Sequence, residues 1–253
     1  MSDKHLTGVK QSHAGAVERL YTEKRDTYRS FISFFRSQDA IRAVLESSRL
    51  LRPKLRVLDA GAGFGTATFA LLDALRGREI QPQAIDAFDL TPAMLEQFQA
   101  ELDSRGIKLV RQQQANVLEL DQQLPSSWMD YDLIISTSML EYVPGPSLSQ
   151  ALSALNARLG PDGALLVIIT RKNLITRMLI EWWWRAPGYS RKALRKAFAN
   201  AGFHDLAFIK FPFRYFWQNL ANHVLIAKVP GTFGHHPEAR RSVHISGADV
   251  LIG

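Results

Sequence analysis

The chain has 253 residues, of which 46% are hydrophobic and 22% are charged; these values are typical of globular proteins and argue against a disordered or membrane-embedded chain. It contains no cysteine, which excludes disulfides, zinc–thiolate sites, iron–sulfur clusters and a cysteine nucleophile. The formal net charge of +7 is uneven, because residues 171–215 hold ten Lys or Arg against two Asp or Glu. We therefore expect this region either to meet an anionic partner or to form a solvated basic helix face.

The N-terminal part of the chain has a helical pattern. Apolar residues recur every three or four positions as far as Leu51, and Pro53 then ends the pattern. No window reaches about 18 uncharged apolar residues, and Asp3 and Lys4 interrupt the start of the chain. We therefore expect neither a membrane span nor a secretion signal, and a cytoplasmic protein.

Strand and helix patterns alternate beyond this point. The predicted strands are residues 55–58, 84–88, 108–114, 131–136, 164–170, 205–211 and 223–229, and the predicted helices are residues 66–75, 92–105, 147–159, 173–184 and 191–201. This alternation predicts an α/β fold: a doubly wound, Rossmann-like sheet of seven strands, mostly parallel with an antiparallel edge strand, and helices on both faces. We divide the chain into an N-terminal helical extension or lid (1–54), an α/β domain (55–229) and a C-terminal tail (230–253).

The loop after the first predicted strand has glycine at alternate positions. Asp59 and Ala60 lead into it, and it contains Gly61, Gly63 and Gly65. Without a Cβ the backbone can turn sharply and approach a ligand, and the following helix offers its N-terminal N–H groups. A carboxylate beside such a loop disfavours a pyrophosphate and favours an amine-bearing ligand. The alternative is that Asp59 only caps N–H groups of the loop.

A second acidic position closes the next predicted strand. Asp89 is followed by Leu90, Thr91 and, at the start of a helix, Met94. Strand topology places Asp89 beside the glycine loop, where a carboxylate can accept hydrogen bonds from both hydroxyls of a ribose. The alternatives are an ordinary helix start capped by Thr91 and a core position for Met94.

Together, these two segments resemble the signature of class I S-adenosylmethionine-dependent methyltransferases, and the resemblance extends over roughly residues 55–229. It implies S-adenosyl-L-methionine as the methyl donor and S-adenosyl-L-homocysteine as the product. It also implies that Asp59 and the glycine loop hold the methionine half of the donor. Asp89 would hold the ribose hydroxyls, and Leu90 and Met94 would flank the adenine.

Three further positions follow from this resemblance. Asn116 and Val117 come after the third predicted strand, where the family commonly has an acid and an apolar residue at the adenine. Asn116 can still accept from the adenine amine through its amide oxygen. Ser136 ends the fourth strand, where the family meets the amino-acid part of the donor. Residues 140–143 resemble the Leu-His-His-Val type of segment found in small-molecule enzymes.

The methyl acceptor is harder to predict, because displacement at a sulfonium needs mainly alignment and exclusion of water. Residues 136–139 lack the Asp/Asn-Pro-Pro-aromatic motif used on adenine amines, which disfavours nucleic acid, although basic aromatic stretches also bind bases. Residues 171–185 form an amphipathic basic pattern that predicts contact with an anionic membrane or a hydrophobic substrate; packing against the N-terminal helices or a second subunit is the alternative. Our leading hypothesis is a small lipid-like, isoprenoid or aromatic acceptor. An RNA or protein methyltransferase and a catalytically silent scaffold are the alternatives.

No general base stands out from the spacing, and nothing indicates an oligomeric state. The candidates are Glu141, Tyr142, His204 and His223, with His5, His13, Tyr21 and Tyr28 in an N-terminal lid. The pair His235 and His236 lacks a carboxylate at ligand spacing, so we predict no metal site. A nicotinamide-dependent oxidoreductase is disfavoured by Asp59 and by the absence of a Tyr-x-x-x-Lys pair.

Overall fold

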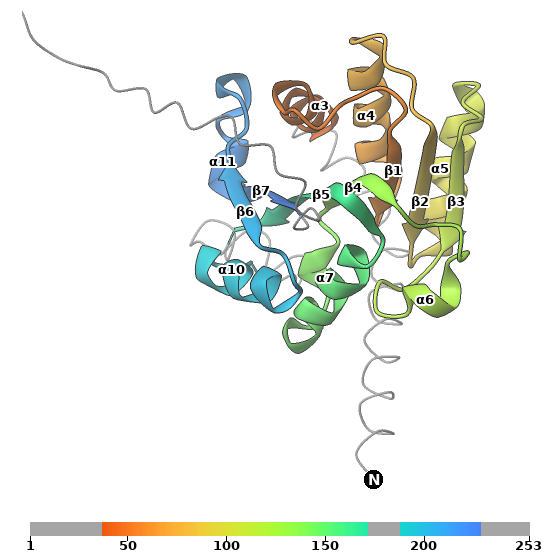
Figure 1. Cartoon of the computed structure of the whole chain (residues 1–253). Helices are drawn as coiled ribbons and strands as arrows, with labels where there is room; N and C mark the ends of the chain where they lie inside the picture. The colour runs from red at the N-terminus through yellow and green to blue at the C-terminus, as the bar shows by residue number, and fades with distance from the viewer. Residues whose placement is uncertain (1–36, 172–187, 229–253) are drawn as a thin grey trace, which may run out of the picture.

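The structure is a computed structural model, and it describes residues 37–171 and 188–228 (Figure 1). Most of the predicted N-terminal extension, the tail 230–253 and all but the first residue of the basic segment 171–185 lie outside these ranges. A sheet of seven strands, in the order β3-β2-β1-β4-β5-β7-β6, forms the centre. The strands are β1 (Arg56–Ala60), β2 (Ala84–Asp89), β3 (Val110–Gln114), β4 (Tyr131–Thr137), β5 (Leu159–Thr170), β6 (Asp205–Ile209) and β7 (Asn222–Lys228).

The connectivity of the sheet confirms the predicted doubly wound, mostly parallel arrangement. The antiparallel strand is β7, which lies between β5 and the edge strand β6. The chain runs outward from β1 through β2 to β3 and then returns to the centre at β4, which pairs with the other side of β1. The winding therefore reverses between β1 and β4. In such sheets, ligands bind outside the carboxyl ends of the strands at this point.

Helices cover both faces of the sheet (Figure 1). One face carries α3 (Ser37–Ser47), α4 (Thr66–Arg76) and α5 (Pro92–Ser104), and the other carries α6 (Leu120–Gln123), α7 (Leu148–Asn156) and α10 (Arg191–Asn200). Each face has its own buried core, with Phe98 in the first and Phe198 in the second. Successive residues of β5, such as Leu165 and Leu166, enter opposite cores. This explains why its sequence is apolar without alternation.

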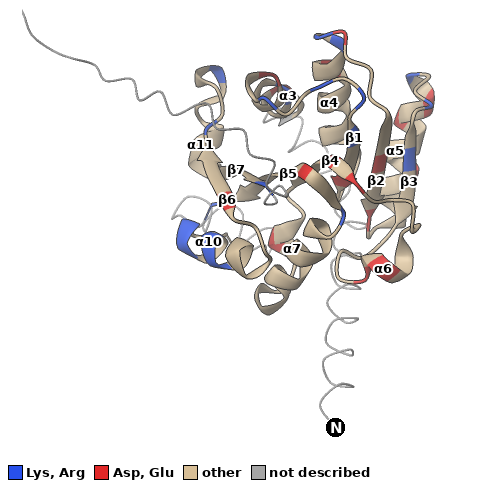
Figure 2. Cartoon of the chain, in the orientation of Figure 1, with Lys and Arg blue, Asp and Glu red and all other residues tan. Residues whose placement is uncertain are grey.

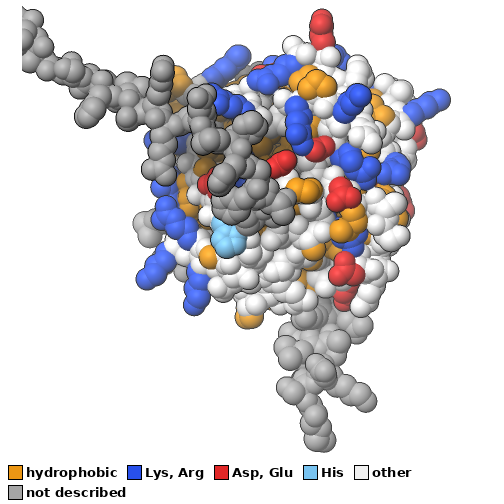
Figure 3. All heavy atoms as spheres, viewed as in Figure 1, with side chains coloured by type: hydrophobic (Ala, Val, Ile, Leu, Met, Phe, Trp, Pro, Cys, Tyr) orange, Lys and Arg blue, Asp and Glu red, His pale blue; other side chains and the backbone are white. Residues whose placement is uncertain are grey.

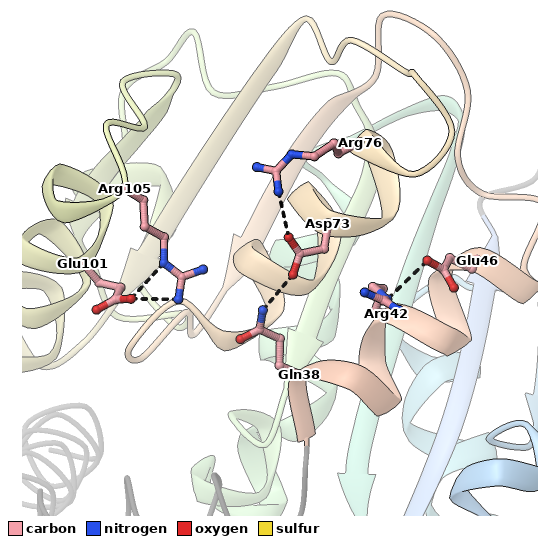
Figure 4. A network of polar contacts seen from close by, with 7 residues as sticks. All are labelled: Gln38, Arg42, Glu46, Asp73, Arg76, Glu101 and Arg105. Atoms are coloured by element: carbon pink, nitrogen blue, oxygen red, sulfur yellow. Dashed lines mark hydrogen bonds and ion pairs between the residues drawn. The ribbon is translucent and has the colours of Figure 1, made fainter.

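Polar contacts tie α3, from the predicted extension, to the α/β layer. The Nε2 atom of Gln38 donates to Oδ2 of Asp73 on α4 at 2.9 Å, and Arg76 lies 3.4 Å from the other oxygen of the same carboxylate (Figure 4). Exposed pairs one turn apart within α3 and α5 complete the network in the figure and contribute only a few tenths of a kcal/mol each. The buried face of α3 contributes more, because it extends the core over α4.

One predicted boundary is wrong. The helix predicted over residues 147–159 ends early, and Gly160 does not close it but lies inside β5. Leu159 pairs with Tyr131 of β4 ahead of a register shift, so β5 begins before the apolar run that predicted it. A Cβ on Gly163 would lie 2.6 Å from the carbonyl oxygen of Tyr131, which shows how closely the two backbones approach at this irregularity.

The connection from β6 to β7 was not predicted to be helical. It contains η4 (Phe213–Tyr215) and α11 (Gln218–Ala221). Because β5 and β6 are both antiparallel to β7, this connection lies at the carboxyl edge of the sheet. The backbone N–H of Arg171, just after β5, donates to the carbonyl of Ala221 at 2.8 Å. Within the residues described, no helix is long and apolar enough to cross a bilayer.

Candidate functional site

The glycine loop between β1 and α4 is held against the end of β2. The backbone N–H groups of Gly61 and Ala62 both donate to the carbonyl of Phe88 at 2.9 Å. Gly61, Gly63 and Gly65 have φ values of +73°, +53° and +80°, which L-residues adopt only with strain. The alternating glycines thus provide the backbone shape of this loop.

Two of these glycines also leave no room for a side chain. A Cβ on Gly61 would lie 2.4 Å from the Cβ of Met139, and a Cβ on Gly65 would lie 2.0 Å from the ring of Phe98. Gly63 is different, because its nearest contact would be the sulfur of Met94 at 3.6 Å. Met94 is buried, as the core alternative required, and it also borders the glycine loop.

Asp89 links the glycine loop to the start of α5. Its Oδ2 atom accepts from the N–H of Gly63 at 2.8 Å, and its Oδ1 atom accepts from the N–H of Thr91 at 2.9 Å. Burial raises the pKa of this carboxyl, and the hydrogen bonds from Thr91 and Gly63 oppose the rise. These bonds fix the carboxylate of Asp89 between the glycine loop and the start of α5.

Asp59 is a buried acid with one oxygen left over. The hydroxyl of Thr68, in the first turn of α4, donates to Oδ2 of Asp59 at 2.6 Å. The Oδ1 atom is buried without a partner among the described residues. Burial raises the pKa of Asp59 to about 7, against the hydrogen bonds from Thr68. Buried polar atoms in folded proteins are almost always paired, so the free oxygen indicates the position of a ligand.

Ser136, near the end of β4, shows the same feature. Its side chain is fully buried, and its Oγ atom has no partner in the described part of the chain. Asp59 pairs with Ile135, the residue before Ser136. The two orphaned oxygens therefore occur on neighbouring strands at the carboxyl edge, where the winding of the sheet reverses.

The third part of this edge follows β3. Asn116 donates its backbone N–H to Oε1 of Gln123 at 2.6 Å, and its Oδ1 atom accepts from the N–H of Leu118 at 3.0 Å. The amide oxygen expected to contact adenine therefore already accepts one hydrogen bond. Its second lone pair and the Nδ2 donor are still available for a ligand. Val117 is buried in the core, whereas Leu90 is half-buried.

Comparisons with known proteins agree with this geometry. Residues 58–165 match the family model described as a methyltransferase domain. This match covers β1, the glycine loop, Asp89 and β4, which are the elements that form the edge just described. The chain therefore contains an S-adenosylmethionine-dependent methyltransferase domain. Its methyl donor is therefore S-adenosylmethionine.

Two curated relatives of this methyltransferase are large by comparison. A 2-methyl-6-phytyl-1,4-hydroquinone methyltransferase from Oryza sativa subsp. japonica is 25% identical over 165 residues, which cover 64% of this chain and 42% of that protein. A highly reducing polyketide synthase from Fusarium sp. is 28% identical over 195 residues, which cover 73% of this chain and 7% of the synthase. The chain thus spans less than half the length of either relative.

Solved structures share the fold of this methyltransferase. The magnesium protoporphyrin IX methyltransferase from Synechocystis PCC 6803, crystallised with S-adenosylhomocysteine, aligns with a TM-score of 0.63 and 18% identity over 85% of this chain and 99% of that one. The methyltransferase domain of the citrinin polyketide synthase aligns with a TM-score of 0.55 and 18% identity over 71% of this chain and 47% of the other. At these identities the likeness establishes the fold.

The base candidates of the methyltransferase are separated by the structure. Glu141, in η1 (Leu140–Tyr142), is buried, and its two oxygens accept from the N–H and the hydroxyl of Thr170 at 3.1 and 2.9 Å. Burial raises the pKa of Glu141 to about 7. His204 precedes β6 and lies at the opposite, amino edge of the sheet. The candidates His5, His13, Tyr21 and Tyr28 lie outside the described residues.

His223 lies on the same side of the molecule as Glu141, because it pairs with Ile169 near the end of β5. Its pKa is lowered to about 4, first by burial and then by the positive charges of Arg171 and Arg191. The ring is therefore neutral at pH 7. Tyr189 is the third titratable residue on this side, with Glu141 and His223. Its pKa is raised by burial and by the charge of Glu141.

Two contacts of the site escaped the sequence analysis. Thr68 lies nine residues after Asp59, and a threonine in an otherwise apolar helix turn is the only local sign of its role. The contact between Glu141 and Thr170 joins residues 29 positions apart. It depends on the pairing of β4 with β5, and no spacing in the sequence indicates it.

Proposed function

We propose that this methyltransferase transfers a methyl group by direct displacement to a small hydrophobic acceptor. The observation that carries the donor half of this proposal is the buried Oδ1 atom of Asp59 beside the glycine loop, which has no partner within the described ranges. A buried carboxylate oxygen that lacks a partner favours a cationic group, and the donor has an ammonium group in its methionine half. Ser136, with its own unpaired oxygen, is the second polar contact that we assign to this half.

The remaining donor contacts follow the carboxyl edge. We assign Asp89 to the ribose hydroxyls, because its bonds from Gly63 and Thr91 hold this buried carboxylate between the glycine loop and the start of α5. The adenine would lie among Leu90, Met94, Asn116 and Val117. When bound, the donor supplies an electrophilic methyl group on its sulfonium. The protein residues orient this group and exclude water from it.

Two observations support a small hydrophobic acceptor. The curated rice relative is named for a phytylated hydroquinone, and the amphipathic pattern of residues 171–185 follows directly after β5 in the sequence. The side chains that gather at the end of β5, Glu141 and Tyr189 among them, provide a polar end for an otherwise apolar acceptor.

Glu141 is the better candidate for the proton acceptor. A general base works best when its pKa is near the working pH. The pKa of Glu141 is about 7, whereas that of His223 is about 4. His223 is therefore too weak a base to deprotonate a hydroxyl efficiently near neutral pH, and we assign it a structural position beside the acceptor.

The test combines turnover with a donor-site variant. The protein is incubated with methyl-labelled S-adenosylmethionine and a panel of prenylated hydroquinones, porphyrin carboxylic acids and polyketide thioesters, with RNA and a protein mixture as further acceptors. We expect label on a hydrophobic small molecule and formation of S-adenosylhomocysteine. Asp89→Asn should weaken donor binding by about 1–3 kcal/mol, since a charge-assisted bond is lost.

Three results would each contradict one part of the proposal. If only RNA or protein carried the label, the acceptor would be a macromolecule and not a small hydrophobic molecule. Donor binding without any turnover would favour a catalytically silent scaffold, and an unchanged donor affinity of folded Asp89→Asn would remove the role assigned to this carboxylate.

A further inference from the structure

The connection between β6 and β7 exposes a cluster of large apolar side chains. Phe213 is 89% exposed, Phe216 and Leu220 are each 55% exposed, and Trp217 is 37% exposed. The only other large apolar side chain as exposed as these, among the residues described, is Leu109 at 47%, which precedes β3 on the far edge of the sheet. Single exposed apolar residues are ordinary, but a contiguous group marks an interaction surface.

The exposed side chains form one patch on a fixed base. The rings of Phe213 and Phe216 stack at 5.9 Å, and Trp217 meets the ring of Phe216 edge-on at 5.8 Å. Beneath them, Tyr215 is buried in the core and contacts Trp217 at 5.7 Å. The side chain of Asn219 bridges the backbone N–H and carbonyl of Phe211 at 2.9 and 3.3 Å. The patch is therefore presented by folded structure and not by a loose loop.

The charged side chains around this patch are positive. Lys210 and Arg214 are exposed within the same connection, and residues 206–228 contain no Asp or Glu. The exposed face of α10 adds four Lys and Arg side chains, of which Arg191 and Arg195 lie over the ring of Phe208 on β6 at 4.9 and 5.2 Å. Figure 2 shows the Lys and Arg positions of α10 in blue, and Figure 3 shows Lys and Arg side chains gathered on the same, left side of the molecule.

This combination fits an anionic lipid surface. Phe, Leu and Trp side chains partition into the boundary between headgroups and acyl chains, and Trp is enriched there. Lys and Arg near an anionic leaflet add electrostatic attraction. A nucleic acid would match the charge, but the rings of the patch stack on one another and not as separate platforms for successive bases. A bilayer accounts for both the apolar and the basic part.

We propose that the η4–α11 patch, formed by Phe213, Phe216, Trp217 and Leu220 with Lys210 and Arg214 at its rim, docks on an anionic lipid bilayer. The patch lies at the carboxyl edge of the sheet, joined to the end of β5 by the hydrogen bond from Arg171 to Ala221. Docking therefore brings the carboxyl edge of the sheet, at the end of β5, close to the lipid. The docking itself does not depend on the proposed methyl transfer.

The test is flotation of the full chain with lipid vesicles, without donor or acceptor. Vesicles of phosphatidylcholine alone are compared with vesicles that contain about 30% phosphatidylglycerol. We expect the wild type to float with the anionic vesicles, and Phe213→Ser combined with Phe216→Ser to lower its partition coefficient at least about tenfold. Lys210→Gln and Arg214→Gln should each lower it about fivefold.

Leu109→Ser is the matched control, because it removes an exposed apolar side chain at the other edge of the sheet and should leave flotation unchanged. Circular dichroism and donor titration establish that each variant is folded. If the double variant fails to fold, the blue shift of Trp217 emission on anionic vesicles, taken as the difference between wild type and Trp217→Phe, provides an independent measurement.

Four outcomes overturn the proposal: no flotation of the wild type, equal flotation of the double variant, no Trp217 shift where that measurement is used, or equal loss in Leu109→Ser. If light scattering instead shows a dimer that the double variant dissociates, without vesicle binding, the patch is an interface between copies. If the patch variants lose only binding to single-stranded oligonucleotides, it is a nucleic-acid surface.

Discussion

The two halves of the carboxyl edge are built in different ways. On the side that we assign to the donor, β1, β2 and the glycine loop are joined by backbone hydrogen bonds, such as those from Gly61 and Ala62 to Phe88. On the side that we assign to the acceptor, the side chain of Glu141, just after β4, is bound to Thr170 at the end of β5. The donor side therefore depends on backbone shape and on a short stretch of sequence, whereas the acceptor side depends on residues that only the tertiary fold brings together.

The largest expected effect tests the backbone shape of the donor side. Gly65→Ala places a methyl group 2.0 Å from the ring of Phe98, at a φ of +80°. Overpacking and left-handed strain together should lower the free energy of unfolding by about 3 kcal/mol. Urea unfolding measures this change.

Gly106→Ala is the control for this substitution. Gly106 also has a positive φ of +64°, but no atom of residues 37–171 and 188–228 lies within 4 Å of its added Cβ. Gly106→Ala should therefore lower the free energy of unfolding only through backbone strain, by about 1 kcal/mol. Equal losses in the two variants would show that close packing of the glycine loop against Phe98 is not what requires glycine there.

The next effect tests the acceptor side. Glu141→Gln should lower turnover about a hundredfold, as expected for the loss of a general base, and leave the dissociation constant of S-adenosylmethionine unchanged. Steady-state rates across pH, with donor titration alongside, measure both. The rate of the wild type should rise with pH up to about 7, where Glu141 loses its proton, and this rise should be absent in the variant. A variant that loses donor affinity instead would contradict the separation of the two halves.

A smaller effect concerns the pH dependence of stability. The pKa of Asp59 is about 7 in the folded protein, compared with 3.8 for an ordinary aspartate. Between these values the folded state holds a proton that the unfolded state has lost, so the free energy of unfolding falls as pH rises through this window. Each such group contributes a slope of about 1.4 kcal/mol per pH unit.

Asp59→Asn should remove its share of this slope, and urea unfolding at several pH values measures it. Glu141 acts in the same direction, because its pKa is also raised to about 7, so part of the slope should remain in the variant. Identical slopes in wild type and Asp59→Asn would mean that Asp59 is not protonated in the folded state.

The smallest effect concerns the unpaired hydroxyl of Ser136. Ser136→Ala removes a buried polar atom that has no partner among the described residues, so the free energy of unfolding without donor should rise by up to about 1 kcal/mol. If this hydroxyl contacts the donor, affinity should fall by about 1 kcal/mol at the same time. Ser153→Ala, on the exposed face of α7, should leave donor affinity unchanged. A loss of stability in Ser136→Ala would indicate that the hydroxyl is already paired.

The arrangement of β1, the glycine loop and the end of β2 was predictable because its information is local. Strand, acid and alternating glycines lie within ten residues, and Asp89 ends the very next strand, so periodicity and turn chemistry placed them correctly. The early start of β5 was missed, because it depends on how Tyr131 pairs with Leu159 and not on hydrophobicity. The exposed aromatic patch was missed for a related reason. Its pattern resembles a core segment, and only the fold shows that Phe213 faces outward while Tyr215 faces inward.

The most direct test is calorimetric titration of the folded chain with S-adenosylmethionine, S-adenosylhomocysteine and NADH. We predict that the first two bind at a single site and that NADH does not bind, because a carboxylate beside the glycine loop repels a pyrophosphate. Binding of S-adenosylmethionine should be lost or weakened in Asp89→Asn. Failure of a folded sample to bind S-adenosylmethionine, or tighter binding of NADH, would contradict the assignment of the carboxyl edge as the methyl-donor site.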